Sequence, residues 1–386
     1  MQNARRLQPE RPLMQSRAFR TVGLPRMHKE AGERRDFLPS LVRSLETLGA
    51  ERIFIESDYG SGMGFSEADY MQASQVVRMV SLQECFAADL VLVLRWPDEA
   101  LIRSMRRGAV LVTMAHFPTR PARVALLKEL GVRSVSLDCL KDDLGRRTVE
   151  NLRAVGWNGV RGAFGELERL LPGFDSPSRP PIRVTVMGAG AVGCHAVSAA
   201  ARYGNPERQR QLHERGVPGV EVTVVDYDLT CHEDYLRGLL RCSDLLVDAT
   251  YRPDATQIII PNDWVADLPE HAVMLDLCVD PYLFAQTPPQ VKGIEGMPEG
   301  NLDQYVFQPD DPGWDRLPPQ VRREQRRTAL SCYSWPGVDP LDCMEVYGRQ
   351  IEPMLRVVVR QGVERLDPER GSEVERSVAR AELMQY

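Results

Sequence analysis

The segment that most constrains this chain is a short apolar run that leads directly into three closely spaced glycines. Val184–Met187 is apolar and rich in β-branched residues, which predicts a buried strand, and Gly188, Gly190 and Gly193 follow it. In a strand–turn–helix crossing these glycines permit the tight turn, the approach of phosphates and close helix packing. The helix that follows offers free N–H groups to a pyrophosphate. The segment therefore predicts a dinucleotide site built from Gly188, Gly190, Ala191, Val192 and Gly193.

Short apolar runs alternate with helical stretches on both sides of these glycines. The expected strands are Ile53–Ile55, Leu90–Leu94, Val110–Thr113, Val132–Leu137, Val222–Val225, Leu245–Val247 and Val273–Leu277. The expected helices are Leu38–Leu48, Asp98–Met105, Ala122–Leu130, Thr148–Leu171 and Leu341–Leu366. This alternation predicts an α/β protein with parallel, doubly wound sheets. Residues 286–330 are rich in Pro, Asp and Arg and are expected to form long loops.

The pattern predicts two Rossmann-like domains with a cleft between them. A substrate domain is expected over residues 21–150 plus 340–386, which makes it discontinuous, and residues 151–339 are expected to form the NAD-binding domain. The Pro/Ser-rich stretch 175–181 leads into the glycine strand. Residues 1–20 hold five arginines without an apolar core, so we expect a disordered tail there rather than a secretory signal.

Charge and cysteine usage exclude several classes of function. The net charge of −6 argues against a nucleic-acid-binding protein, which usually carries a basic surface. The eight cysteines are scattered and form no CxxC pair, so we expect no metal site and no disulfide scaffold, as in a cytoplasmic protein. No apolar run approaches the roughly 20 residues that cross a bilayer, so no membrane partner is expected. A homo-oligomer stays open.

The choice of cofactor depends on the acidic residue after the second strand of the nucleotide domain. Asp226 follows Val222–Val225, where a carboxylate binds the ribose hydroxyls and repels a 2′-phosphate, so NAD is favoured over NADP. Tyr227 beside it joins the candidate cofactor residues. A polar segment, 203–219, lengthens the spacing from the glycines and is interpreted as a surface insertion. Two alternatives stay open: Asp226 is only a turn residue, or an arginine of the insertion binds a phosphate, the candidates being Arg208, Arg210 and Arg215.

Polar side chains also follow the expected strands of the first domain. Arg95-Trp96-Pro97 comes after Leu90–Leu94, and His116 comes just after Val110–Thr113. Arg34 and Arg35 lie in a charged segment that begins at Lys29. Because residues beyond the carboxyl ends of parallel strands line the ligand crevice, we expect these side chains at a substrate site.

These features, in this order, resemble the family of alanine dehydrogenases, transhydrogenase N-terminal domains and lysine-forming saccharopine dehydrogenases. The resemblance covers roughly residues 21–360 and rests on the shared order of several motifs. They are Lys29-Glu30 with Glu33-Arg34-Arg35 and Pro39, then Gly60-Ser-Gly-Met-Gly-Phe-Ser-Glu-Ala-Asp-Tyr70, Arg95-Trp96-Pro97, His116, the glycine turn and Leu275-Asp-Leu-Cys-Val-Asp280. The segment Asp138 to Arg147 is more similar to the saccharopine branch.

The resemblance implies a two-domain NAD-dependent oxidoreductase that acts on the CH–NH bond of an amino acid. By this likeness His116 and Arg95 are catalytic, and Thr250 and Asp280 contact the cofactor. The substrate-binding residues would be Arg34, Arg35, Asp138 and Arg147, with the arginines on carboxylates, which their planar fork suits. The partners are then an amino acid and a 2-oxo acid, with a secondary amine of the saccharopine or opine type slightly favoured as product.

Two departures from the family pattern leave other functions open. Arg95 stands where the family has lysine, and arginine cannot act as a base because its pKa exceeds about 12. Proton transfer would then fall to His116. Trp96 replaces a glutamate of the saccharopine branch, which makes lysine a doubtful substrate. The alternatives are an alanine-dehydrogenase-like deaminase that uses ammonia, a non-catalytic NAD(H) sensor, and one half of a membrane-coupled transhydrogenase.

Overall fold

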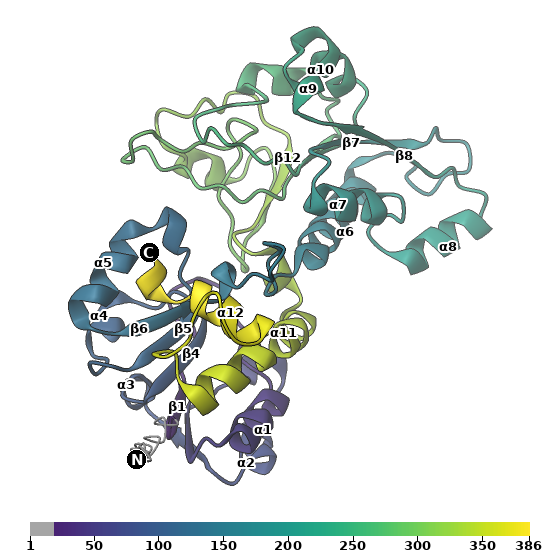
Figure 1. Cartoon of the computed structure of the whole chain (residues 1–386). Helices are drawn as coiled ribbons and strands as arrows, with labels where there is room; N and C mark the ends of the chain where they lie inside the picture. Colours follow the sequence, from purple (N-terminus) through teal and green to yellow (C-terminus); the bar gives the residue numbers. More distant parts are fainter. Residues whose placement is uncertain (1–18) are drawn as a thin grey trace, which may run out of the picture. The chain divides into compact units, whose positions relative to one another are not determined.

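The computed structural model describes residues 19–386, and the chain divides into two compact units (Figure 1). The first unit contains residues 19–27, 36–150 and 347–386. The second contains residues 28–35 and 151–346. The expected tail, residues 1–20, falls almost wholly outside the described residues. Segment 28–35 belongs to the second unit by its contacts, which the sequence pattern did not indicate.

The first unit is built on a six-stranded parallel sheet in the order β3-β2-β1-β4-β5-β6. Its strands are β1 (Thr21–Leu24), β2 (Arg52–Glu56), β3 (Val77–Val80), β4 (Leu90–Arg95), β5 (Val110–Met114) and β6 (Arg133–Ser136). In β4 every residue from Leu90 to Leu94 is buried, as expected for a parallel strand with helices on both faces. This strand order is that of a doubly wound Rossmann-like sheet, whose ligand crevice lies at the carboxyl ends of its strands.

The C-terminal part of the chain completes the first unit. The helices of the first unit are α1 (Pro39–Leu48), α2 (Glu67–Ala73), α3 (Leu82–Phe86), α4 (Glu99–Arg103), α5 (Pro121–Leu130) and, from the C-terminal part, α12 (Glu373–Arg380). Glu382 bridges to Val135 at the sheet edge and forms an ion pair with Arg133 of β6 at 3.0 Å. The ring of Tyr386 packs on Phe117 at 5.1 Å between centroids. These contacts explain why this unit is discontinuous in sequence (Figure 1).

The second unit holds a six-stranded sheet in the order β11-β12-β10-β9-β7-β8, parallel except for the β11–β12 pair. Its strands are β7 (Ile182–Met187), β8 (Val220–Val225), β9 (Leu245–Asp248), β10 (Val273–Asp276), β11 (Val306–Phe307) and β12 (Thr328–Ser331). Its helices are α6 (Leu152–Leu170), α7 (Ala191–Ala200), α8 (Pro206–Glu214), α9 (Tyr227–Thr230) and α10 (Glu233–Leu240). Helix α11 (Pro340–Gln361) runs from this unit into the first.

The α/β class with two Rossmann-like sheets is confirmed, and one local prediction needs correction. Residues 286–330 are not only loops, because Thr328–Ser331 is a fully buried strand that pairs with β10 in register. The 203–219 segment, interpreted as a surface insertion, contains helix α8, which Asn205 caps by accepting from the backbone of Glu207 and Arg208. No helix of the described residues is long and apolar enough to cross a membrane.

Candidate functional site

The glycine turn joins β7 to α7 in the second unit. Gly188 has φ +97°, a conformation that favours glycine, and a Cβ there would lie 2.5 Å from the Ala249 carbonyl oxygen. A Cβ on Gly193 would lie 2.0 Å from the Gly188 carbonyl oxygen, so the helix packs on the turn too closely for any side chain. A Cβ on Gly190 would meet nothing within 4 Å. The glycine segment therefore leaves open space at the N-terminus of α7. A helix N-terminus with such space suits the binding of a pyrophosphate.

The last residues of four neighbouring parallel strands form one row beside this turn. Met187 pairs with Asp248, Asp248 pairs with Asp276, and Asp276 pairs with Ser331. The loop after β9 continues to Thr250, whose N–H and hydroxyl both donate to Asp248 Oδ1. Because ligands of open parallel sheets bind outside these carboxyl ends, the row defines one wall of the candidate site.

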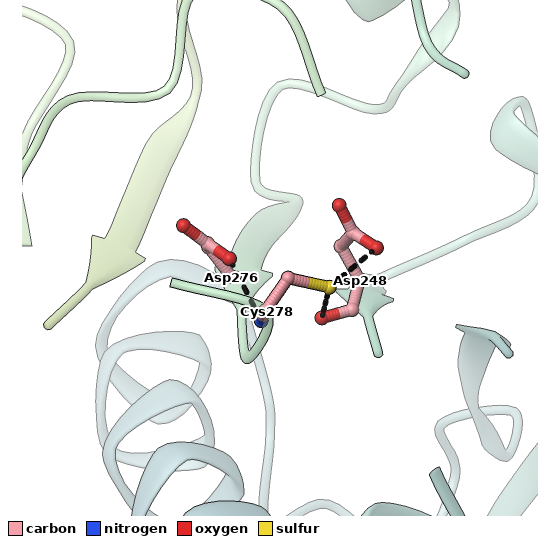
Figure 2. Close-up of side chains that lie close together, drawn as sticks. All are labelled: Asp248, Asp276 and Cys278. Carbon is pink, nitrogen blue, oxygen red and sulfur yellow. Dashed lines mark hydrogen bonds between the residues drawn. The ribbon is translucent and has the colours of Figure 1, made fainter. Parts of the chain in front are cut away.

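Two buried aspartates of this row, Asp248 and Asp276, lie on either side of Cys278 (Figure 2), and their pKa values are shifted in opposite directions. Burial, with the charge of Asp276, raises the pKa of Asp248. Burial would also raise the pKa of Asp276, but the ammonium of Lys292, 2.6 Å from its Oδ2, holds it below its usual value. Cys278 links the two: its N–H donates to Asp276 Oδ1, and its Sγ lies 3.2 Å from Asp248 Oδ1. Sequence reasoning missed Asp248, Lys292 and Cys278 as a cluster.

The candidate ribose-binding aspartate lies at the carboxyl end of β8. Asp226 is exposed and caps α9 by accepting from the backbone of Tyr227 at 2.9 Å, and the Tyr227 side chain is exposed as well. The three arginines that could have bound a phosphate are instead paired with carboxylates: Arg208 with Glu168, Arg210 with Glu207 and Arg215 with Asp175. Their pairing leaves Asp226 as the charged group at the expected ribose position.

The first unit brings His116 and Asp138 together at the ends of β5 and β6. His116 Nδ1 lies 3.2 Å from Asp138 Oδ2, and the His116 backbone N–H donates to Oδ1 of the same carboxylate at 3.1 Å. His116 has φ +53°, a strained backbone conformation for a residue other than glycine. Its side chain is half exposed while that of Asp138 is buried. A buried carboxylate thus orients an accessible imidazole, as in sites that transfer protons.

Burial would raise the pKa of Asp138, but the hydrogen bonds and charge of His116, with the Ser136 hydroxyl, hold it well below its usual value. We expect Asp138→Asn to lower the free energy of unfolding by about 2 kcal/mol at pH 7, because a charge-assisted pair is lost. A depressed folded-state pKa stabilises above the unfolded value, about 3.9, and that contribution disappears as the pH falls through the folded value. Denaturant titrations at pH 7, 5 and 3 should show the wild type losing its advantage only below pH ~4. Glu129→Gln, in an exposed pair with Arg103, is the control.

Arg95 ends β4, and in the neighbouring strand it pairs with Met114, two residues before His116. Trp96 is buried, with the guanidinium of Arg123 4.8 Å above its ring. Arg123 also donates to the carbonyl oxygen of Ala115 at 3.1 Å. Sequence reasoning missed Arg123, which supports the backbone that carries His116. Trp96 is therefore a packing residue beside the end of β4.

The three arginines expected to bind a substrate carboxylate each lie beside a carboxylate of the chain itself. Arg35 is buried, and its Nε and Nη2 donate to both carboxylate oxygens of Glu33, at 2.8 and 2.5 Å. Its Nη1 also donates to Ser334 Oγ at 2.9 Å, so these contacts hold the guanidinium in place, and binding of a substrate carboxylate by Arg35 stays a prediction. Arg34 faces Asp303 at 3.4 Å and stays exposed. Arg147 lies 3.9 Å from Glu150 and donates to the carbonyl oxygen of Val149.

A cavity of about 330 Å³ lies wholly within the second unit, beside the strand-end row. Lys292 and Ser331 line it together with Asp280, the expected cofactor contact. Asp280 is held by Arg252 at 2.5 Å and by Gln290 at 3.1 Å. The residue before it, Val279, has φ +61°, which strains a β-branched side chain. Strained residues of this kind gather at functional sites, so the loop after β10 belongs to the candidate site.

Comparisons with known proteins agree with this architecture. The family described as alanine dehydrogenase/PNT, N-terminal domain, matches residues 23–155. An alanine dehydrogenase of Geobacillus stearothermophilus is 24% identical over 67% of this chain and 72% of its own length. An NAD(P) transhydrogenase subunit alpha of Cereibacter sphaeroides is 28% identical over 50% of this chain and 40% of its own length.

Two solved structures share the fold. One titled L-alanine dehydrogenase superposes with a TM-score of 0.70 at 20% identity, covering 94% of each chain. A transhydrogenase from Sinorhizobium meliloti gives 0.63 at 16% identity, covering 88% of this chain and 95% of its own. Two Rossmann-like units and the glycine turn define the class as NAD-binding oxidoreductases of the Rossmann type. Within that class, residues 23–155 match the N-terminal domain of the alanine dehydrogenase/PNT family, and the alanine dehydrogenase relative resembles the chain beyond that domain.

Proposed function

We propose that this protein is an NAD-dependent amino-acid dehydrogenase that interconverts an amino acid with a 2-oxo acid and ammonia. The observation that carries the proposal is the pair His116–Asp138 at the strand ends of one unit, in a chain whose other unit holds the glycine turn. The relatives described above include an alanine dehydrogenase and a transhydrogenase subunit, which favours ammonia over an amino acid as the amine. The secondary-amine product expected from the sequence becomes one arm of the test.

The chain's own groups have distinct tasks in this reaction. The nicotinamide supplies or accepts a hydride at the substrate carbon. Gly188, Gly190 and Gly193 hold the pyrophosphate against α7, and Asp226 binds the ribose hydroxyls. His116, oriented by Asp138, moves the proton that amine addition to the carbonyl releases. Arg95, whose charge is permanent, binds the substrate carboxylate or polarises the carbonyl oxygen and does not exchange its proton.

The direct test is a substrate panel followed at the absorbance of NADH. Pyruvate, glyoxylate and 2-oxoglutarate are each offered with ammonia, and then with alanine or lysine as amine donor. The proposal expects NADH oxidation with ammonia and a small 2-oxo acid. Oxidation only with an amino acid as donor would favour the secondary-amine reaction. Tight NADH binding without oxidation in any arm would overturn the enzyme assignment in favour of a sensor.

Asp226 provides a test of the cofactor choice. We expect Asp226→Ser to reduce the preference for NADH over NADPH by about tenfold or more, equivalent to ~1.4 kcal/mol, because the repulsion of a 2′-phosphate is lost. Serine preserves the cap on α9, so the fold should be unaffected. The measurement is the ratio of the two dissociation constants by quenching of protein fluorescence. Asp228→Ser, two residues away and exposed, should leave the ratio unchanged, and an unchanged ratio in Asp226→Ser would contradict the assignment.

A further inference from the structure

Lysine is scarce in this chain, and one lysine is buried at the candidate site. Only four of the 48 basic residues are lysines, at positions 29, 128, 141 and 292, and the others are arginines. Lys292 has 4% of its side chain exposed and lines the cavity beside the strand-end row. A buried ammonium is costly unless it is paired, so a lysine in this place needs a physical reason.

The pairing of Lys292 is short and specific. Its Nζ donates to Asp276 Oδ2 at 2.6 Å and to Ser331 Oγ at 3.4 Å. Ser331 in turn donates to the same carboxylate oxygen at 3.0 Å. An ammonium carries three N–H donors, so these two acceptors leave one donor for a ligand in the cavity. Asp276 and Ser331 are the last residues of β10 and β12, so two strands of the sheet fix the amine.

Other ionisable groups around Lys292 are mostly acidic. The ring of Tyr282 lies 5.9 Å from Nζ, and Asp248 lies behind the backbone of Gly293. Asp280, Glu299, Glu30 and Tyr333 line the cavity with it. Cys278, whose burial raises its thiol pKa, bridges the two aspartates. Lys292 is thus the cationic donor among the cavity-lining residues that the structure describes.

The carboxylates and the thiol near Lys292 do not suit a divalent metal ion. Asp248, Asp276 and Cys278 offer atoms within 4.8 Å of one another, as Figure 2 shows. The Lys292 ammonium already neutralises Asp276 at 2.6 Å, and burial with the charge of Asp276 raises the pKa of Asp248. Neither feature suits a divalent cation, which needs ionised ligands free of a competing ammonium.

We propose that Lys292 is the acid that protonates the departing hydroxyl of the carbinolamine formed from a 2-oxo acid and ammonia. The proton passes from the Lys292 ammonium to that hydroxyl, the C–O bond breaks, and water leaves. The nitrogen lone pair forms the C=N bond of the iminium, which the hydride then reduces. Lys292 is left neutral and regains a proton from solvent. This role rests on the proposed function, and it places a lysine in a reaction for which Arg95 cannot release a proton.

The decisive variant keeps the positive charge at position 292 but replaces the ammonium with a guanidinium, which does not release a proton in the reaction. We expect Lys292→Arg to lower kcat for amination by about 100-fold or more, while the dissociation constant for NADH stays within about twofold. The pH profile of kcat should lose the limb that Lys292 contributes. Lys128→Arg, the same change on the exposed surface of α5, should leave kcat and the profile unaltered. A purely structural lysine would instead lower stability without removing a limb from the profile.

A second measurement uses the wild-type apoprotein. Reductive methylation with formaldehyde and cyanoborohydride, followed by peptide mass spectrometry, resolves all four lysines. We expect Lys292 to be methylated through the cavity, and lactate to protect it while Lys128 is unprotected, because lactate carries the carboxylate and hydroxyl of the carbinolamine. A Lys292 that reacts only after unfolding, or that lactate leaves unprotected, overturns the assignment.

The two proposals fail in different ways. Turnover in Lys292→Arg with an unchanged pH profile overturns the role of Lys292 and leaves the proposed function standing. Absence of turnover in the wild type overturns the proposed function and the proton step with it. Protection of Lys292 by lactate in that case would still identify it as a residue that contacts a ligand.

Discussion

His116→Ala should lower kcat for amination by about 10²- to 10⁴-fold, the range that a positioned acid–base group contributes. The dissociation constant for NADH should change little, because the glycine turn belongs to the other unit. Stopped-flow measurement of NADH oxidation at saturating 2-oxo acid and ammonia reads the effect directly.

Two matched variants make this result specific to the imidazole. His213→Ala removes an exposed histidine from helix α8 and should leave kcat unchanged. Asp138→Asn keeps the imidazole but removes the carboxylate 3.2 Å from its Nδ1, so a smaller loss than that of His116→Ala is expected. A His116→Ala variant that retains kcat within about twofold would exclude the proposed proton transfer.

Substitution of the glycines should separate cofactor binding from folding. In Gly193→Ala the new methyl would lie 2.0 Å from the Gly188 carbonyl oxygen, so we expect the free energy of unfolding to fall by about 3 kcal/mol. In Gly190→Ala the methyl meets no protein atom within 4 Å, so stability should change by less than about 1 kcal/mol. That methyl occupies the space expected for the pyrophosphate, and NADH should bind about 30-fold more weakly, a loss of ~2 kcal/mol.

The measurements for this pair are denaturant unfolding and a fluorescence titration with NADH. Gly238→Ala provides the control, because a Cβ there also meets nothing within 4 Å and the residue lies in helix α10. Wild-type affinity in Gly190→Ala would show that the open space at α7 does not receive the phosphates. Wild-type stability in Gly193→Ala would show that the turn can move away from the helix.

The sequence predicted the parts of the site that are local. His116 and Arg95 were expected at the carboxyl ends of strands because polar residues there follow apolar runs, and the structure places Arg95 at the end of β4 and His116 two residues after β5. The glycine turn was predicted from three glycines that directly follow an apolar run, and the structure shows a steric requirement for glycine at Gly188 and Gly193. Strand β12 was missed because only four residues, Thr328–Ser331, stand between polar and arginine-rich flanks, too few to show a period.

The parts that were missed depend on contacts between distant segments. Lys292 and Asp276 are 16 residues apart, and only the return of the chain to the sheet brings them within 2.6 Å. Arg35 was expected to bind a substrate carboxylate, although its guanidinium donates to both carboxylate oxygens of Glu33, two residues earlier. A nearby acid in the sequence was the available signal for that pair. Whether Glu33 forms an ion pair with Arg35 depends on the burial of both side chains, which the local sequence pattern did not show.

The contacts of Glu382 and Tyr386 with the first sheet bear on the order in which the protein folds during synthesis. Residues 151–346 form nearly all of the second unit as one continuous stretch, so that unit has most of its chain early. The first unit cannot be completed until the residues beyond 346 have been synthesised. Among them are Glu382, which pairs with Arg133 of β6, and Tyr386, which packs against Phe117 beside His116. Domains generally fold as units as the chain emerges from the ribosome. The nucleotide-binding half is therefore expected to mature first, and the histidine-bearing half last.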